Sequence, residues 1–105
     1  MNSSKQRLSQ QEVRELLQEL PEWALEEGQL VRFWTFPDFA GAMYFVKRVA
    51  RLAEQANHHP DIDIRYNRVK LALSSHDAGG ITARDTDLAR RLSSCRIQPP
   101  ARWAA

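Results

Sequence analysis

The sequence predicts an α+β domain in which a four-stranded antiparallel sheet, built from two hairpins, carries three helices on one face. Two patterns support this fold class. Apolar residues recur every three to four positions in three separate stretches, as they do in amphipathic helices. Between these stretches lie two pairs of short runs rich in β-branched and aromatic residues, and a polar break joins each pair. The expected order is α-β-β-α-β-β-α in a single domain spanning 1–105, with its core at about 9–96 and a loosely held tail at 97–105.

The first helix is predicted at about 9–20. Ser9 and Glu12 have the spacing of a capping box, and Pro21 ends the helix. Four apolar residues then recur at helical spacing: Val13, Leu16, Leu17 and Leu20.

The first hairpin is expected to join strands at 23–25 and 30–36 through a polar turn that contains Gly28. Side chains alternate between the two faces of a strand. One predicted face of the second strand holds Val31, Phe33 and Thr35, and the other holds Arg32, Trp34 and Phe36.

The longest helix is predicted to begin after Asp38, which is a good N-cap, and to end at Asn57, because Pro60 prevents its continuation. Its predicted core-facing stripe comprises Phe39, Ala42, Met43, Val46, Val49, Ala50 and Ala53. Three more apolar residues lie outside this stripe or at its edge: Tyr44, Phe45 and Leu52. They indicate a partner surface, so we expect a homodimer or homotetramer that forms through this helix or through sheet edges.

The second hairpin is predicted from alternating residues at 62–64 and 69–73, with Tyr66-Asn67-Arg68 between them. After a flexible Gly79-Gly80 break, Thr82 to Asp85 is expected to cap the third helix. The predicted inner face of this helix comprises Leu88, Ala89, Leu92 and Cys95, and Gln98-Pro99-Pro100 ends it.

Composition excludes several classes of protein. The chain has 105 residues, a net charge of +2 and one cysteine, so an internal disulfide is excluded. No apolar stretch is long enough for a membrane span, and the first ten residues lack a secretory signal, so we expect a cytoplasmic protein. Its arginines are spread along the chain, and a nucleic-acid surface normally shows them clustered.

The three histidines are concentrated in one part of the chain. His58 and His59 are adjacent, Glu54 precedes them by one helical turn, and Asp77 follows His76. Imidazoles change charge near neutral pH, so this grouping predicts a site that handles protons. If the second hairpin folds back along the sheet, its end returns near the histidine pair, and three imidazoles share one cleft.

Other interpretations of the histidines stay open at this level. A histidine at a helix end can simply cap carbonyl groups. A zinc site has enough ligands, but no His-x-x-x-His or Cys-x-x-Cys spacing is present, and His58 and His59 point in different directions. A nucleophile formed by Ser74 or Ser75 with His76 is less favoured, because neighbours in a strand face opposite ways.

These residues resemble the signature of pterin-4a-carbinolamine dehydratases. The matching positions read Glu54-x-x-x-His58-His59-Pro60, followed by Tyr66, His76 and Asp85. The segments 36–39, 69–76 and 80–85 also look like the family pattern, and the similarity covers about 23–92. The resemblance implies a four-stranded antiparallel sheet with three helices on one side, in agreement with the pattern-based prediction.

The resemblance also implies an activity, the dehydration of 4a-hydroxytetrahydropterin to the quinonoid dihydropterin in the recycling of that cofactor. The leaving hydroxyl needs a proton and a ring nitrogen must lose one, and imidazole can serve in both roles near neutral pH. The expected substrate is a small pterin, and no metal or organic cofactor is implied.

By this resemblance His58, His59 and His76 are the active-site histidines, and Glu54 orients or polarises the pair. The positions of His58 and His76 are viewed as acid or base catalysts, and that of His59 as binding the pterin. Further positions expected at the substrate are Trp23, Asn57, Pro60, Ser75, Asp77, Arg84 and Asp85. Core packing is the competing role for Trp23, and helix capping is the competing role for Asp85.

One departure from the family pattern concerns Asn57. Many relatives have an aspartate directly before the histidine pair, and a neutral amide supplies no charge there. Two other functions are compatible with the resemblance. One is a non-catalytic module that pairs with a transcription factor through the long helix, and the other is a pterin-binding role in molybdopterin metabolism.

Overall fold

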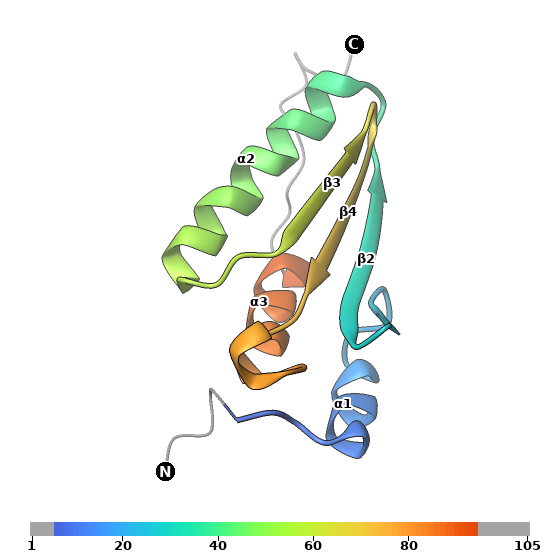
Figure 1. Cartoon of the computed structure of the whole chain (residues 1–105). Helices are drawn as coiled ribbons and strands as arrows, with labels where there is room; N and C mark the ends of the chain where they lie inside the picture. Colours follow the sequence, from blue (N-terminus) through green and yellow to red (C-terminus); the bar gives the residue numbers. More distant parts are fainter. Residues whose placement is uncertain (1–5, 95–105) are drawn as a thin grey trace.

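The computed structural model describes residues 6–94, and its elements follow the order expected from the sequence (Figure 1). The helices are α1 (Gln10–Leu17), α2 (Phe39–Ala56) and α3 (Ala83–Ser94). The strands are β1 (Ala24–Glu26), β2 (Gln29–Thr35), β3 (Asp61–Arg65) and β4 (Arg68–Leu73). A short 3-10 helix, η1 (His76–Ala78), was not predicted. Cys95, the helix end at 98–100 and the tail at 97–105 lie outside the described residues.

Local capping explains where the helices begin. Ser9 and Glu12 form the expected capping box, with Glu12 N donating to Ser9 Oγ at 3.1 Å. Asp38 accepts a hydrogen bond from Gly41 N at 2.8 Å and starts α2. Helix α1 is shorter than expected, because residues 18–20 continue in bonds of the i→i−3 type.

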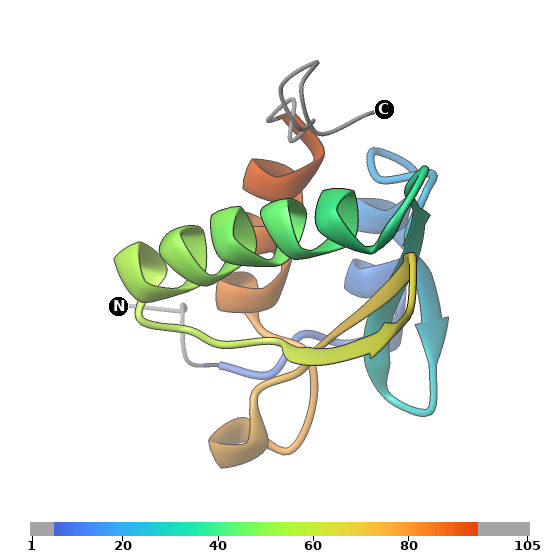
Figure 2. The ribbon, with the colours of Figure 1, turned by 90° about the horizontal axis from the view of Figure 1, so that it is seen from above.

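The four strands form one antiparallel sheet in the order β1-β2-β4-β3. The two hairpins are therefore joined where β2 pairs with β4, and β4 lies in the middle of the sheet. All three helices lie on one side of this curved sheet (Figure 2), which confirms the expected fold class. No helix within 6–94 combines the length and apolar character needed to cross a membrane.

The face that α2 turns to the core differs from the predicted stripe. Phe45 is only 1% exposed, and its ring lies 4.7 Å from that of Trp34 and 5.1 Å from that of Phe36. Phe39 is instead an exposed large apolar residue. Apolar residues make up more than half of this helix, so their spacing did not define one face. The ring of Phe45 packs against Trp34 of β2 and Phe36 just after it. Assigning Phe45 to a partner surface was therefore wrong.

The alternation expected in β2 is present from Arg32 onward, whereas Leu30 and Val31 are both buried. Trp34 and Phe36 pack inward, while Phe33 is 52% exposed on the outer face, with Lys70 Nζ 5.7 Å from its ring. The Arg32 guanidinium lies over the Trp34 ring at 4.3 Å. Burial lowers the pKa of Arg32, and the carboxylate of Glu22 partly opposes that shift.

Candidate functional site

The C-terminal end of α2 sets the direction in which the histidine pair leaves the helix. Asn57 has φ 51° and ψ 40°, the left-handed conformation that ends many helices. The His58 amide donates to the Ala53 carbonyl at 3.1 Å, so the backbone turns sharply before His59. Asparagine adopts this conformation more readily than most residues, which gives a structural reason for an amide at this position.

We expect Asn57→Ala to lower the free energy of unfolding by about 1 kcal/mol, because alanine pays a steric penalty in the left-handed region. Asn57→Gly should cost less, since glycine enters that region freely. Urea denaturation of both variants measures the difference. Equal losses in the two variants would show that the side chain, rather than the backbone conformation, is what matters.

His58 is held by a buried carboxylate. Its Nε2 lies 2.5 Å from Asp85 Oδ1, and the side chains of His58 and Asp85 are 11% and 0% exposed. The other carboxylate oxygen, Oδ2, accepts hydrogen bonds from Ser75 Oγ at 2.8 Å and from Thr82 N at 2.9 Å. One carboxylate thus ties together the end of α2, the segment after β4 and the start of α3.

The sheet register explains why these distant segments meet. Asp61, the first residue of β3, pairs with Ala72 near the end of β4. The residues that follow β4 therefore lie alongside those that precede β3, as expected from the return of the second hairpin. A bridge between Ser75 and Gly80, with Ser75 N donating to Gly80 O at 2.8 Å, closes the loop that contains η1.

His59 pairs with a different carboxylate. Its Nε2 lies 2.5 Å from Glu54 Oε2, one helical turn back on α2, and both side chains are exposed. Glu54 thus orients His59, whereas Asp85 holds His58. An exposed pair of this kind contributes little to stability. Its value to a site lies in fixing where the imidazole points.

His76 begins η1 and is exposed. Its side chain makes no hydrogen bond or ion pair with any residue of 6–94. It lines a hollow of about 330 Å³ together with Glu27, Gly28, Gln29, Ser74, Ser75, Gly79 and Gly80. The structure connects this segment to His58 through Ser75 and Asp85, but no hydrogen bond joins the His76 ring to His58 or His59. The meeting of three imidazoles in one cleft stays a prediction.

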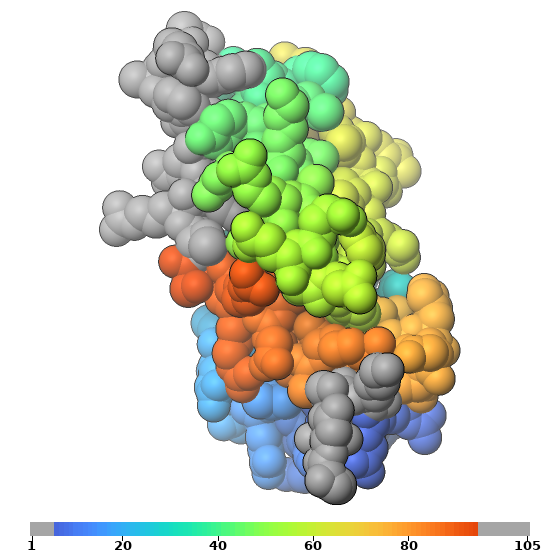
Figure 3. All heavy atoms as spheres, turned by 90° about the vertical axis from the view of Figure 1, so that its left-hand side faces the viewer, coloured from blue at the N-terminus to red at the C-terminus, as the bar shows by residue number. Residues whose placement is uncertain are grey.

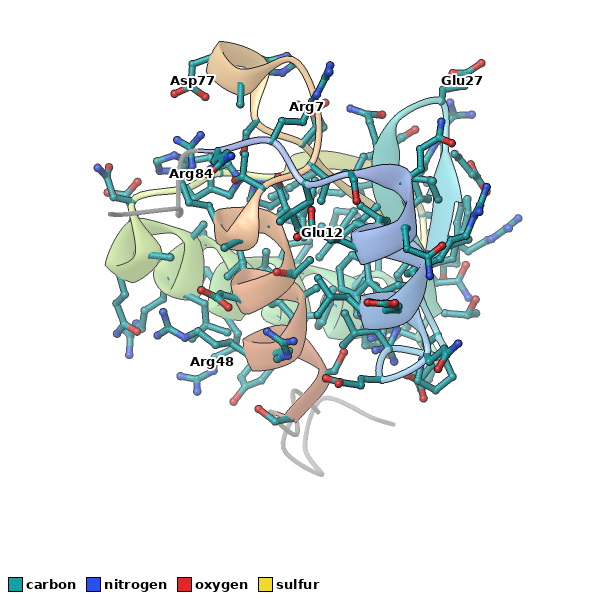
Figure 4. All side chains as sticks on the ribbon, turned by 90° about the horizontal axis from the view of Figure 1, so that it is seen from below. Arg7, Glu12, Glu27, Arg48, Asp77 and Arg84 are labelled. Carbon is teal, nitrogen blue, oxygen red and sulfur yellow. The ribbon has the colours of Figure 1, made fainter. Side chains whose placement is uncertain are left out.

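Two charged residues expected at the substrate do come together. Arg84 Nη2 donates to Asp77 Oδ1 at 2.8 Å, and Arg84 Nε donates to Thr82 Oγ1 at 3.3 Å (Figure 4). Asp77 lies on η1 directly after His76, so this pair places charge beside that histidine.

Trp23 and Pro60 occupy two contrasting places. Trp23 is buried in the core, where its Nε1 donates to Ser93 Oγ at 2.9 Å and its ring packs edge-on against Trp34. No contact connects it with the histidines, and core packing is the role that the structure shows. Pro60 is half-buried between the histidine pair and β3.

Thr82 was not predicted as part of the site, only as part of a helix cap. Its hydroxyl lies 2.8 Å from Ser75 Oγ, and its amide bonds Asp85, so it belongs to the group around His58. The signal in the sequence was the spacing of Thr82 and Asp85, which is typical of a helix start. Within 6–94, no three His, Cys, Asp or Glu side chains are placed to hold a metal ion.

A family model and two similar proteins carry the same family description. The family model described as Pterin 4 alpha carbinolamine dehydratase matches residues 6–95. Over 87 residues the chain is 56% identical to a protein of Thermomicrobium roseum named "Putative pterin-4-alpha-carbinolamine dehydratase", and the match covers 83% of this chain and 94% of that protein. A protein of the same name from Chloroflexus aurantiacus is 55% identical over 86 residues, with 82% of this chain and 92% of that protein covered.

Two solved structures are similar as well. The crystal structure of a transcriptional coactivator/pterin dehydratase from Brucella melitensis has a TM-score of 0.79 and 33% identity, and the match covers 84% of this chain and 96% of that one. A pterin dehydratase-like protein identified as a RuBisCO assembly factor in the alpha-carboxysome has a TM-score of 0.55 and 20% identity, covering 69% and 83% of the two chains. This second similarity shows the fold alone.

Proposed function

The chain belongs to the pterin-4-alpha-carbinolamine dehydratase family, and from that membership we propose that it dehydrates 4a-hydroxytetrahydropterin by histidine acid–base catalysis. The observation that carries the proposal is the pairing of His58 with the buried carboxylate of Asp85. A buried carboxylate at one imidazole nitrogen leaves the other nitrogen for proton transfer. The His76 segment joins the same group of residues through Ser75.

The proposed reaction needs two proton transfers and no change of oxidation state. A ring nitrogen of the pterin loses its proton, and the electron pair forms a carbon–nitrogen double bond at C4a. The C4a–oxygen bond breaks, and the hydroxyl takes a proton and leaves as water. Each positioned proton transfer contributes about 10²- to 10⁴-fold in rate, so two histidines suffice for substantial catalysis.

We assign the histidine roles from family membership and from the contacts of each side chain. His58 and His76 exchange protons with the substrate, and His59, oriented by Glu54, binds the pterin. Five further residues shape the site without proton transfer: Asn57 and Pro60 direct the histidine pair, Arg84 and Asp77 provide charge beside His76, and Asp85 holds His58. Trp23 is left out of the binding set, because its indole is held in the core by Ser93.

The test is the ultraviolet-monitored decay of a freshly made 4a-carbinolamine with and without the protein. We expect the initial rate to rise in proportion to protein concentration, and a heat-unfolded sample to have no effect. A rate that is unchanged by the folded protein would reject the proposal. Pterin binding without acceleration would instead favour a role in another pathway, such as molybdopterin metabolism.

The outer face of α2 is the surface through which a homo-oligomer was expected to form. Figure 3 shows the molecule from the side on which this helix lies, and a groove of about 420 Å³ there is lined by Met43, Tyr44, Lys47, Arg48 and Arg51. Of the three residues expected to form a partner surface, only Tyr44 lines this groove, because Phe45 and Leu52 pack against the core. Two copies meeting at this face would bring like charges together. This face thus gives no support to a dimer through α2, and the oligomer size stays a prediction. The cytoplasmic location also stays a prediction.

A further inference from the structure

The polar group around Asp85 is buried and fully connected. Asp85, Ser75 and Thr82 are each at most 1% exposed. Three groups hydrogen-bond the carboxylate directly: His58 Nε2, Ser75 Oγ and Thr82 N. Thr82 Oγ1 joins them through Ser75 Oγ. Polar groups buried to this extent are hydrogen-bonded in folded proteins, and here they bond one another.

The hydrogens in this group can be assigned from chemistry. Thr82 Oγ1 accepts from Arg84 N at 3.2 Å and from Arg84 Nε at 3.3 Å, so its own hydrogen points to Ser75 Oγ at 2.8 Å. Ser75 then donates its hydrogen to Asp85 Oδ2. An amide nitrogen only donates, so the Thr82 amide also gives its hydrogen to Oδ2.

The remaining oxygen, Oδ1, faces His58 Nε2. A carboxylate only accepts hydrogen bonds, so the hydrogen between these atoms belongs to the imidazole. The opposite ring nitrogen of His58, Nδ1, makes no hydrogen bond with any residue of 6–94. Neutral His58 therefore has a lone pair at Nδ1 and no hydrogen to give there.

From this geometry we propose that Ser75, Thr82 and Asp85 are positioning residues that hold His58 in one tautomer, with its hydrogen on Nε2. Resting on the proposed function, this assigns His58 as the base, which takes the pterin ring proton at Nδ1. The imidazolium so formed lies beside the Asp85 carboxylate, which stabilises it. The proton for the leaving hydroxyl then comes from another group, and the unpartnered His76 is the histidine available.

The decisive experiment measures the tautomer directly in the full chain without substrate. Long-range ¹H–¹⁵N NMR correlations distinguish the two neutral forms of His58. We expect hydrogen on Nε2 in the wild type. In Asp85→Asn the side-chain amide can donate to Nε2, so the hydrogen should move to Nδ1 and dehydration should fall by about 10²- to 10⁴-fold, mainly in kcat.

Two milder variants keep the test valid if Asp85→Asn does not fold. Ser75→Ala and Thr82→Val each remove one hydroxyl from the group, and we expect mixed tautomers and about a tenfold loss of kcat. The matched control is Thr86→Val in α3, whose buried hydroxyl donates to Ala83 O at 3.2 Å and makes no hydrogen bond with the side chains of this group. In this control variant the His58 tautomer and the rate of turnover should equal those of the wild type.

The outcomes separate this inference from the proposed function. Hydrogen on Nδ1 in the wild type would overturn the inference. An unchanged His58 tautomer in Asp85→Asn, Ser75→Ala and Thr82→Val would overturn it too, because a merely structural network leaves the imidazole as it was. A shifted tautomer in a protein whose wild type fails to dehydrate the carbinolamine would uphold the positioning role and reject only the enzymatic proposal.

Discussion

A His58→Gln protein should keep the wild-type fold and lose about 10²- to 10⁴-fold in the rate of carbinolamine dehydration. Glutamine can still donate an N–H to Asp85 Oδ1, so the buried carboxylate keeps a partner. Its amide has no basic nitrogen, so the proton transfer is lost. The measurement is the ultraviolet-monitored decay of the carbinolamine, with circular dichroism to confirm the fold.

His59→Gln is the matched comparison. His59 is exposed, and Glu54 is its only partner among residues 6–94. Its replacement should therefore mainly raise KM and retain a larger share of kcat than His58→Gln does. If His58→Gln turned over substrate as fast as the wild type, His58 would have no part in the chemistry. If the two variants lost the same share of kcat, the distinction between a buried proton-transfer group and an exposed binding group would be wrong.

Phe45→Asp should not fold. The ring of Phe45 is 1% exposed and packs between Trp34 and Phe36. Removing such a ring costs about 3–5 kcal/mol, and burying an unpaired carboxylate adds several more. Domains of this kind are stable by only about 5–15 kcal/mol in total. Urea titration followed by circular dichroism should therefore show no cooperative transition.

The same substitution on the outer face of the sheet provides the control. Phe33 is 52% exposed, so Phe33→Asp should change the free energy of unfolding by only about 0.5 kcal/mol. If Phe45 lay on a partner surface, as its position in the sequence indicated, Phe45→Asp would break assembly and leave folded monomers. A folded monomeric Phe45→Asp protein would support that earlier expectation and contradict the packing described here.

Features that depend on short-range contacts could be predicted from the sequence. Ser9 and Asp38 cap their helices as expected, and Asn57 ends α2 in the left-handed conformation. Each cap involves a side chain and a backbone group within a few residues, so its signal is local. The sequence placed Glu54 near both histidines, but in the structure it pairs with His59, and His58 pairs with Asp85.

Features that depend on packing could not be predicted from the sequence. The rotation of α2 that buries Phe45 depends on two aromatic rings, Trp34 in β2 and Phe36 just after that strand. The role of Ser75 was also hidden, since a serine beside a histidine suggests a surface contact as readily as a buried one. Its hydroxyl reaches Asp85 only because the η1 loop folds back to the start of α3.

The sequence by itself determined the order of helices and strands, their caps and the family signature, because periodicity and short-range spacing define these features. Only the tertiary structure decided which face of α2 is buried and which carboxylate holds which histidine. His58 and Asp85 are 27 residues apart, and their side chains meet because the sheet register brings the end of β4 and the start of α3 to the end of α2. Long-range contacts of this kind depend on how whole elements pack, and no local pattern encodes them.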